Sequence, residues 1–67
     1  GLLAYARTSG DQRVIVALNF TSDVQELTAP QLAPSGTVLL GSHRSAGEHV
    51  DVRPLRLRPL ESVVFVP

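Results

Sequence analysis

The chain has 67 residues, of which 43% are hydrophobic and 18% charged, so it is long enough for one small globular domain and too short for an enzyme with its own deep cleft. Six basic and six acidic residues give a formal net charge of zero, which argues against a nucleic-acid partner or an anionic membrane surface. The sequence contains no cysteine, which excludes disulfides and thiolate–zinc sites. A core of this size supplies only about 3–5 kcal/mol, so we expect the domain to rely on a partner.

Two antiparallel strands joined by a tight turn are predicted at the beginning of the chain. Residues 2–8 form a short apolar stretch, and Ser9-Gly10-Asp11-Gln12 has the composition of a hairpin turn. Residues 13–20 follow as a mostly apolar run, rich in β-branched residues, that is apolar on both alternating faces. Because such a run is typical of the centre of a sheet, we expect residues 13–20 to form a central strand.

The next segment, residues 24–31, is interpreted as a strand near a sheet edge. Asp23 and Glu26 have the spacing of a helix capping box. Pro30, however, leaves only about six residues for a helix, and helices shorter than about 12 residues are marginal without packing. A short edge strand accommodates the proline better.

The second half of the chain reads as further strands separated by turns. Residues 37–42 follow the turn sequence Ala33-Pro34-Ser35-Gly36, and residues 60–66 form the last strand. Within residues 50–57 the apolar positions change parity around Pro54, as a bulge or a break between two strands would require. No helical period is present, so we predict an all-β fold, an antiparallel Greek-key β-sandwich of about six to seven strands.

Four segments of the chain carry a resemblance to a known family: Leu3-Ala-Tyr-Ala-Arg7, Val14-Ile-Val-Ala-Leu-Asn-Phe-Thr21, Val38-Leu-Leu-Gly-Ser42 and Leu57-Arg-Pro-Leu-Glu-Ser-Val-Val-Phe65. In this order they resemble the C-terminal domain of α-amylase-superfamily enzymes, glycoside hydrolase family 13, and most of all the α-glucosidases and oligo-1,6-glucosidases. The resemblance spans the whole chain, residues 1–67. It implies one accessory domain from a longer enzyme, with the (β/α)₈ catalytic barrel of the same polypeptide as its partner.

The resemblance brings no catalytic residue onto this chain, because the family's catalytic carboxylates lie at the ends of barrel strands. It implies a non-catalytic β-sandwich that packs against and stabilises the barrel of an α-glucosidase-like glycoside hydrolase. The alternative is a glucan- or starch-binding surface module, although no Trp and a single Tyr make a poor platform for stacking sugars. A third reading is an independent interaction domain, with the resemblance accidental.

Other groups of functional residue types are interpreted as structural. The carboxylates are assigned to turns and surface charges rather than to a catalytic pair: Asp11, Asp23, Glu26, Glu48, Asp51 and Glu61. His43 and His49 share a loop without a known metal-ligand spacing, and Ser42 with His43 and Asp51 lacks a nucleophile elbow, so no metal, cofactor or triad is expected. Asn19 begins a glycosylation sequon but is interpreted as an amide at a strand end that binds turn backbone.

The run Arg53, Arg56 and Arg58 is interpreted as part of a solvated sheet face, with Leu55 and Leu57 pointing inward. An interdomain contact is the alternative reading of these arginines. No apolar run approaches the roughly 18 residues of a membrane helix, so we expect no membrane partner. No signal peptide is visible, which leaves the compartment open, and our expectation is a cytoplasmic location.

A contact surface is predicted from the two apolar faces of the second strand. The bulkier set is expected to fill the core: Val14, Val16, Leu18 and Phe20. Ile15 and Ala17 lie on the opposite face, and Ala4 and Ala6 of the first strand join them if register places them alongside. These four residues are the predicted interdomain contact, which docks on the barrel or, when the domain is alone, on a second copy of the chain.

Overall fold

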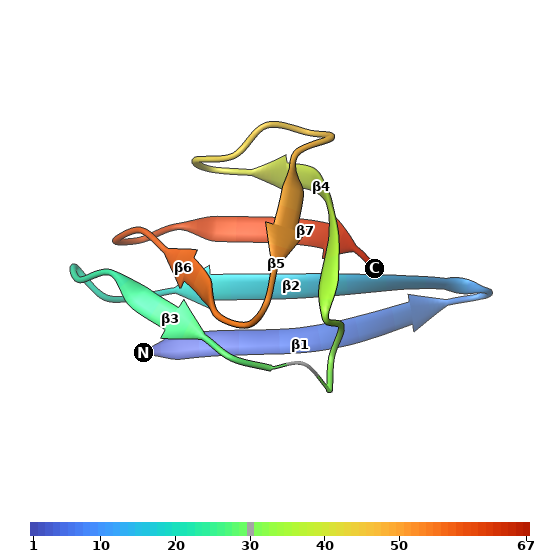
Figure 1. The fold of residues 1–67 in the computed structure, drawn as a ribbon, viewed down its shortest axis with the longest axis horizontal. Helices are drawn as coiled ribbons and strands as arrows, with labels where there is room; N and C mark the ends of the chain where they lie inside the picture. Colours follow the sequence, from blue (N-terminus) through green and yellow to red (C-terminus); the bar gives the residue numbers. More distant parts are fainter. Residues whose placement is uncertain (30) are drawn as a thin grey trace.

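The computed structural model describes residues 1–29 and 31–67, and this part of the chain contains strands and turns but no helix. The strands are β1 (Leu2–Ser9), β2 (Gln12–Asn19), β3 (Gln25–Leu27), β4 (Ser35–Gly41), β5 (His49–Asp51), β6 (Leu55–Leu57) and β7 (Ser62–Val66). They form a five-stranded sheet of order β1-β2-β7-β4-β5 and a two-stranded sheet of β3 and β6 (Figure 1). The prediction of an all-β sandwich is confirmed.

All strand pairs are antiparallel, and the last strand, β7, lies between β2 and β4 in the Greek-key manner. The radius of gyration is 10.9 Å, close to the ~11 Å expected for a chain of this length. No helix long and apolar enough to span a membrane occurs in the described residues.

The first two strands form the predicted hairpin. Ser9 pairs with Gln12, so the turn consists of Gly10 and Asp11 alone. Gly10 has a φ of 61°, in the left-handed region where glycine carries no steric penalty. Because β2 pairs with β1 on one side and with β7 on the other, the prediction of a central second strand is confirmed.

The predicted strand at residues 50–57 is two strands that lie in different sheets. The chain leaves the five-stranded sheet after Asp51 and enters the two-stranded sheet at Leu55, with the Arg53–Pro54 peptide bond in the cis form between them. Val52 on one side of this crossing and Leu55 on the other are both buried. The parity change at Pro54 is therefore a break between strands, one of the two predicted outcomes.

Two other predicted strands are shorter in the structure. The strand predicted at residues 24–31 is limited to β3, which pairs with β6, and Pro30 lies outside the described residues. The strand predicted at residues 60–66 begins only at Ser62. The reason is a turn across residues 58–61, closed by a 3.0 Å hydrogen bond from the Glu61 amide to the Arg58 carbonyl.

The hydrophobic core lies between the two sheets and draws on nearly every strand. Its members are Ile15, Ala17, Leu27, Ala29, Ala33, Val38, Val50, Val52, Leu55, Leu57, Val63 and Phe65. Phe65, Ile15 and Leu57 are the largest apolar side chains among the fully buried ones. The small sheet packs on one face of the large sheet, which is the inner face. In the described residues the opposite face of the large sheet has no second sheet packed on it.

Candidate interdomain surface

The predicted contact residues of β2 lie inside the domain, so the face assignment of this strand is wrong. Ile15 and Ala17 are both 0% exposed. In the register of the large sheet Ile15 pairs with Phe65 and Ala17 with Val63, and all four side chains point toward the small sheet. Large core side chains such as Phe65 and Leu57 of β6 come from other strands. The core can therefore accept a side chain as small as that of Ala17 on β2.

The register expected for the first hairpin is nevertheless present. Ala4 pairs with Ala17 and Ala6 with Ile15. Ala4 and Ala6 are half-buried and pack against the core. The four residues therefore do lie together, but on the inner face of the sheet, where Ile15 and Ala17 have no surface with which to meet another domain.

The side chains predicted to fill the core instead lie on the outside of the large sheet. Directly opposed residues of antiparallel strands share a face, so Tyr5, Val16, Val64 and Leu40 form one row across four strands. We call this surface the outer sheet face; its apolar residues are Leu3, Tyr5, Val14, Val16, Leu18, Leu40, Val64 and Val66, and Arg7, Thr37 and Ser62 lie on the same face toward its edges. Phe20, also predicted to be core, is exposed just beyond the end of β2.

The outer sheet face is apolar and accessible. Tyr5 is 36% exposed and Leu40 is 64% exposed, while the valines between them in the row are half-buried by their neighbours on the sheet. An irregularity in the pairing of β4 with β7, between Val38 and Leu40, leaves both Leu39 and Leu40 exposed. Contiguous apolar surface of this kind on a small domain is typical of an interaction site.

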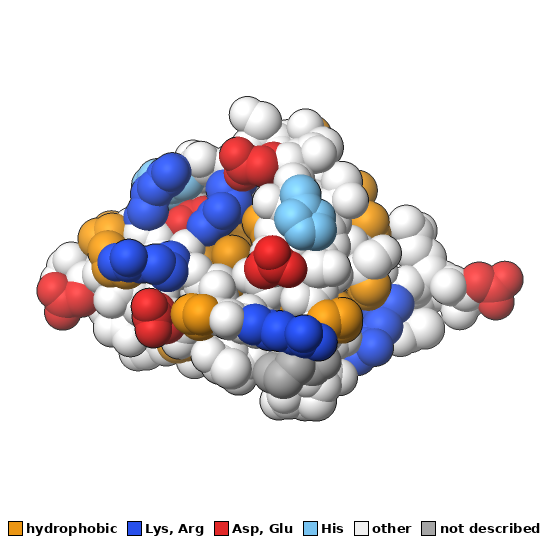
Figure 2. Space-filling view, viewed as in Figure 1, with side chains coloured by type: hydrophobic (Ala, Val, Ile, Leu, Met, Phe, Trp, Pro, Cys, Tyr) orange, Lys and Arg blue, Asp and Glu red, His pale blue; other side chains and the backbone are white. Residues whose placement is uncertain are grey.

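The surface formed by the small sheet and β5 has the opposite character. Glu26 of β3 pairs with Arg56 of β6, and Arg53 and Asp51 are exposed nearby in the chain. Figure 2 shows arginine, acidic and histidine side chains gathered over β3, β5 and β6. The interpretation of the arginines as a solvated sheet face fits this arrangement, as does the inward position of Leu55.

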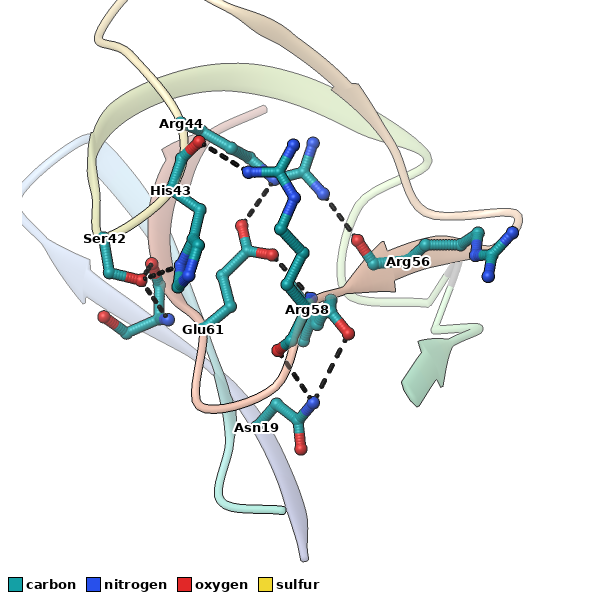
Figure 3. A network of polar contacts seen from close by, with 9 residues as sticks. Asn19, Ser42, His43, Arg44, Arg56, Arg58 and Glu61 are labelled. Atoms are coloured by element: carbon teal, nitrogen blue, oxygen red, sulfur yellow. Dashed lines mark hydrogen bonds and ion pairs between the residues drawn. The ribbon is translucent and has the colours of Figure 1, made fainter. Parts of the chain in front are cut away.

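The carboxylate of Glu61 is buried and binds both the β4–β5 loop and the turn before β7 (Figure 3). Glu61 is buried, and its Oε2 accepts a 2.8 Å hydrogen bond from Arg44 Nε while its Oε1 accepts one of 2.7 Å from the Arg58 amide. The guanidinium of Arg44 also donates to the Arg56 carbonyl, and that of Arg58 to the His43 carbonyl at 3.0 Å. Glu61 is therefore engaged in structural contacts.

Asn19 closes the end of β2 from inside the fold. Its side-chain nitrogen donates to the carbonyls of Asp23, Leu57 and Arg58, and its side-chain oxygen accepts from the Thr21 amide at 2.9 Å. The Asn19 side chain is buried, and its oxygen and nitrogen both have hydrogen-bond partners. The interpretation of Asn19 as a strand-end amide that binds turn backbone, rather than as a glycosylation site, agrees with these contacts.

The loop histidines have local partners. His43 Nδ1 lies 2.7 Å from Ser42 Oγ, while Asp51 lies near His49 instead, at 3.7 Å, with both of the latter side chains largely in solvent. In the described part of the chain no three metal-ligating side chains gather into a cluster, and no pocket is present. The Ser42 and His43 pair thus lies on an open surface and lacks the carboxylate that a triad requires.

Sequence reasoning missed the outer sheet face and the role of Glu61. The sequence does contain a signal for Glu61. Pro59 predicts a turn, and that turn places Glu61 directly before the last strand. The signal for the outer face was ambiguous, because β2 is apolar on both faces and bulk alone favoured Val16 over Ala17 for the core.

Comparison with known proteins assigns the chain to a family. Residues 1–66 match the family model of the beta-galactosidase C-terminal domain. Among solved structures, the chain is similar to isomaltulose synthase from Erwinia rhapontici NX5, with 29% identity and a TM-score of 0.70 over 97% of this chain and 12% of that one. A mutant of that enzyme in complex with D-glucose gives 27% identity and a TM-score of 0.72 with the same coverages. No curated protein sequence matches the chain.

The fold, the family match and the structural likeness together define an all-β C-terminal domain of glycoside hydrolases. The chain belongs to the family of beta-galactosidase C-terminal domains. The resemblance to a C-terminal domain of glycoside hydrolase family 13 is confirmed by the likeness to isomaltulose synthase. The chain spans about 12% of the length of the solved structures that it matches.

Proposed function

We propose that this chain is the non-catalytic accessory domain of a longer glycoside hydrolase, and that it packs against the catalytic unit of that polypeptide and stabilises it. The observation that carries the proposal is the family match over residues 1–66. In addition, the part of the matched enzyme that resembles this chain is only 12% of that enzyme's length. The two matches are named for different reactions, a beta-galactosidase and an isomaltulose synthase. Because the chain is similar to domains of enzymes with different reactions, a structural role accounts for it better than a role in binding or converting one substrate.

The catalytic unit is proposed to be an α-glucosidase-like (β/α)₈ barrel. The likeness at 27–29% identity to isomaltulose synthase, one of whose structures contains sucrose as its natural substrate, supports an enzyme acting on α-linked glucose. The test is hydrolysis by the full-length polypeptide of α-glucosides, such as sucrose and isomaltose, against β-galactosides. Turnover of β-galactosides alone would contradict this part of the proposal and leave the accessory role intact.

Deletion of residues 1–67 from the full-length polypeptide tests the accessory role. The truncated enzyme is expected to unfold at a lower temperature and to lose activity faster on warming, because the surface that the domain covers becomes exposed to water. Its turnover number measured on freshly folded enzyme should fall much less, since the chemistry is proposed to lie elsewhere. An unchanged unfolding temperature would contradict the stabilising role.

A further inference from the structure

We infer that the outer sheet face is the surface through which this chain docks on the catalytic unit of its own polypeptide. The inference rests on the proposed function and specifies the contact that carries it out. The row of Tyr5, Val16, Val64 and Leu40 forms the centre of the contact, and it presents no charged side chain across four adjacent strands. Arg7, which pairs with Val14, lies one row further along the same face and provides a charged rim.

The contrast between the two outer surfaces of the sandwich selects this face. The small sheet presents the cross-strand pair of Glu26 and Arg56, and charged side chains are spread over that side of the molecule among smaller apolar patches (Figure 2). Burial of such charges is costly unless each finds a partner, whereas burial of the outer sheet face removes apolar surface from water. A neighbouring domain is therefore expected on the large sheet, and solvent on the small one.

The size of the face favours a covalently linked neighbour over a second copy of the chain. Four strands about 4.8 Å apart, with about six residues each at a rise of about 3.3 Å, cover roughly 400 Å². Counted over both partners, such a contact buries roughly 800 Å², which falls within the roughly 600–1,500 Å² of contacts between domains of one chain but below the roughly 1,600 Å² of stable complexes between separate proteins. Linkage in one polypeptide supplies the effective concentration that so small a face needs.

A strained, exposed residue in the turn that leads into β7 also fits a contact. Leu60 follows Pro59 in the turn across residues 58–61 and has a φ of 58°, where a glycine would be free of strain. Its side chain is 67% exposed, so the domain itself gains little from it. Its amide donates to the Thr21 carbonyl, which places the turn next to exposed Phe20 at the end of β2. A large apolar side chain kept at such a position is explained by a partner that covers it.

Cysteine labelling tests the inference, because the chain has no cysteine of its own. Leu40→Cys reports on the outer sheet face, and Val24→Cys, just before β3, is the matched control at an exposed apolar residue outside that face. Each variant is prepared as the 67-residue chain and as the full-length polypeptide. The alkylation rate of the introduced thiol is then followed by peptide mass spectrometry, which distinguishes it from any other cysteine of the longer protein.

Both thiols are expected to react readily in the 67-residue chain. In the full-length polypeptide, Leu40→Cys should react slower by about tenfold or more, while Val24→Cys keeps its rate. Equal rates for Leu40→Cys in both contexts would overturn the inference. Protection of Leu40→Cys in the 67-residue chain that grows with chain concentration would also overturn it, in favour of a second copy as the occupant.

The outcome is separable from that of the proposed function. If deletion of residues 1–67 leaves the catalytic unit equally stable but Leu40→Cys is protected in the full-length polypeptide, docking stands and the stabilising role fails. If deletion destabilises the catalytic unit but Leu40→Cys stays reactive, the domain acts through another surface and the inference fails.

Discussion

Single residues in this domain are constrained mainly by backbone that approaches them closely, and Gly36 shows this most clearly. A Cβ atom placed on Gly36 would clash with the Val66 carbonyl oxygen and would lie 2.6 Å from Cδ2 of Phe65. The clash involves backbone on one side and the largest core side chain on the other, so neither can move without disturbing the pairing of β4 with β7. The sequence marked Gly36 only as part of a turn, whereas the structure places it within β4.

Gly36→Ala is expected to destabilise the isolated chain by about 1–3 kcal/mol, the usual cost of overpacking a core. Urea unfolding followed by circular dichroism measures the change. Gly41→Ala, in the same strand, is the control, because its Cβ would come no closer than 3.3 Å to another atom and should cost less. Equal losses at the two positions would show that the approach of Phe65 and Val66 is not the cause.

Leu60→Gly is expected to stabilise the isolated chain by about 0.5–1 kcal/mol, because relief of a left-handed residue outweighs the extra backbone entropy of glycine. The side chain is mostly in solvent, so its removal costs little packing. Thermal unfolding of the two chains measures the difference. A loss of stability would mean that Leu60 packs against the domain itself and would remove its support for the contact.

Elements of the fold are held in place by contacts between segments far apart in the chain. Glu61, just before β7, binds Arg44 in the β4–β5 loop, and neither partner lies in a strand. The pair joins the ends of two strands that are themselves neighbours in the large sheet, β4 and β7. The ion pair therefore stabilises the loops that connect the strands. This matters here because β5 and β6 have only three residues each and make few hydrogen bonds to neighbouring strands.

Glu61→Ala is expected to leave the isolated chain largely unfolded at 25 °C. Loss of one partner of a buried ion pair costs about 3–5 kcal/mol, which matches the whole stability expected of so small a core. Circular dichroism and the dispersion of amide NMR signals report the folded fraction. Glu26→Gln is the control, because that exposed carboxylate should change stability by no more than about 0.5 kcal/mol. A folded Glu61→Ala chain would contradict the structural role of the carboxylate.

The two faces of β2 are expected to respond differently to the same new residue. Ile15→Thr replaces the ethyl branch of the side chain by a hydroxyl without a partner in the core, at a cost of about 2 kcal/mol or more. Val16→Thr keeps the shape of the side chain on the outer sheet face, where the hydroxyl reaches water, and should cost less than about 0.5 kcal/mol. Urea midpoints of the two variants give the order, and the reverse order would restore the face assignment made from side-chain bulk.

At the scale of the whole molecule, the domain is a sandwich with its own core and one unsatisfied surface. The small sheet covers only one side of the large one, so the apolar content of β1 and β2 exceeds what the domain itself can bury. This excess supports the proposed contact with a neighbouring domain, which the marginal core of a 67-residue chain also favours.

The isolated chain is expected to show no binding of maltooligosaccharides at sub-millimolar concentration. The exposed aromatic side chains are Tyr5, set in a row of aliphatic residues, and Phe20, beyond the end of β2, and they do not form the paired platform on which sugar rings stack. Isothermal titration calorimetry with maltoheptaose is the measurement. Saturable heat with a dissociation constant below the millimolar range would favour the glucan-binding alternative.

The sequence by itself determined the features that depend on neighbours along the chain. Period-two patterning predicted the strands, Gly10 the hairpin turn, and the parity change at Pro54 a bulge or a break between strands at that point, because each signal lies within a few residues of its effect. Only the tertiary structure decided which face of β2 is buried. Both faces are apolar, so the choice depends on core residues such as Phe65 and Leu57, which lie about forty or more residues away in the sequence and are buried in the same cluster as Ala17. The burial of Glu61 was likewise decided by Arg44, whose approach follows from the pairing of β4 with β7 and from no local pattern.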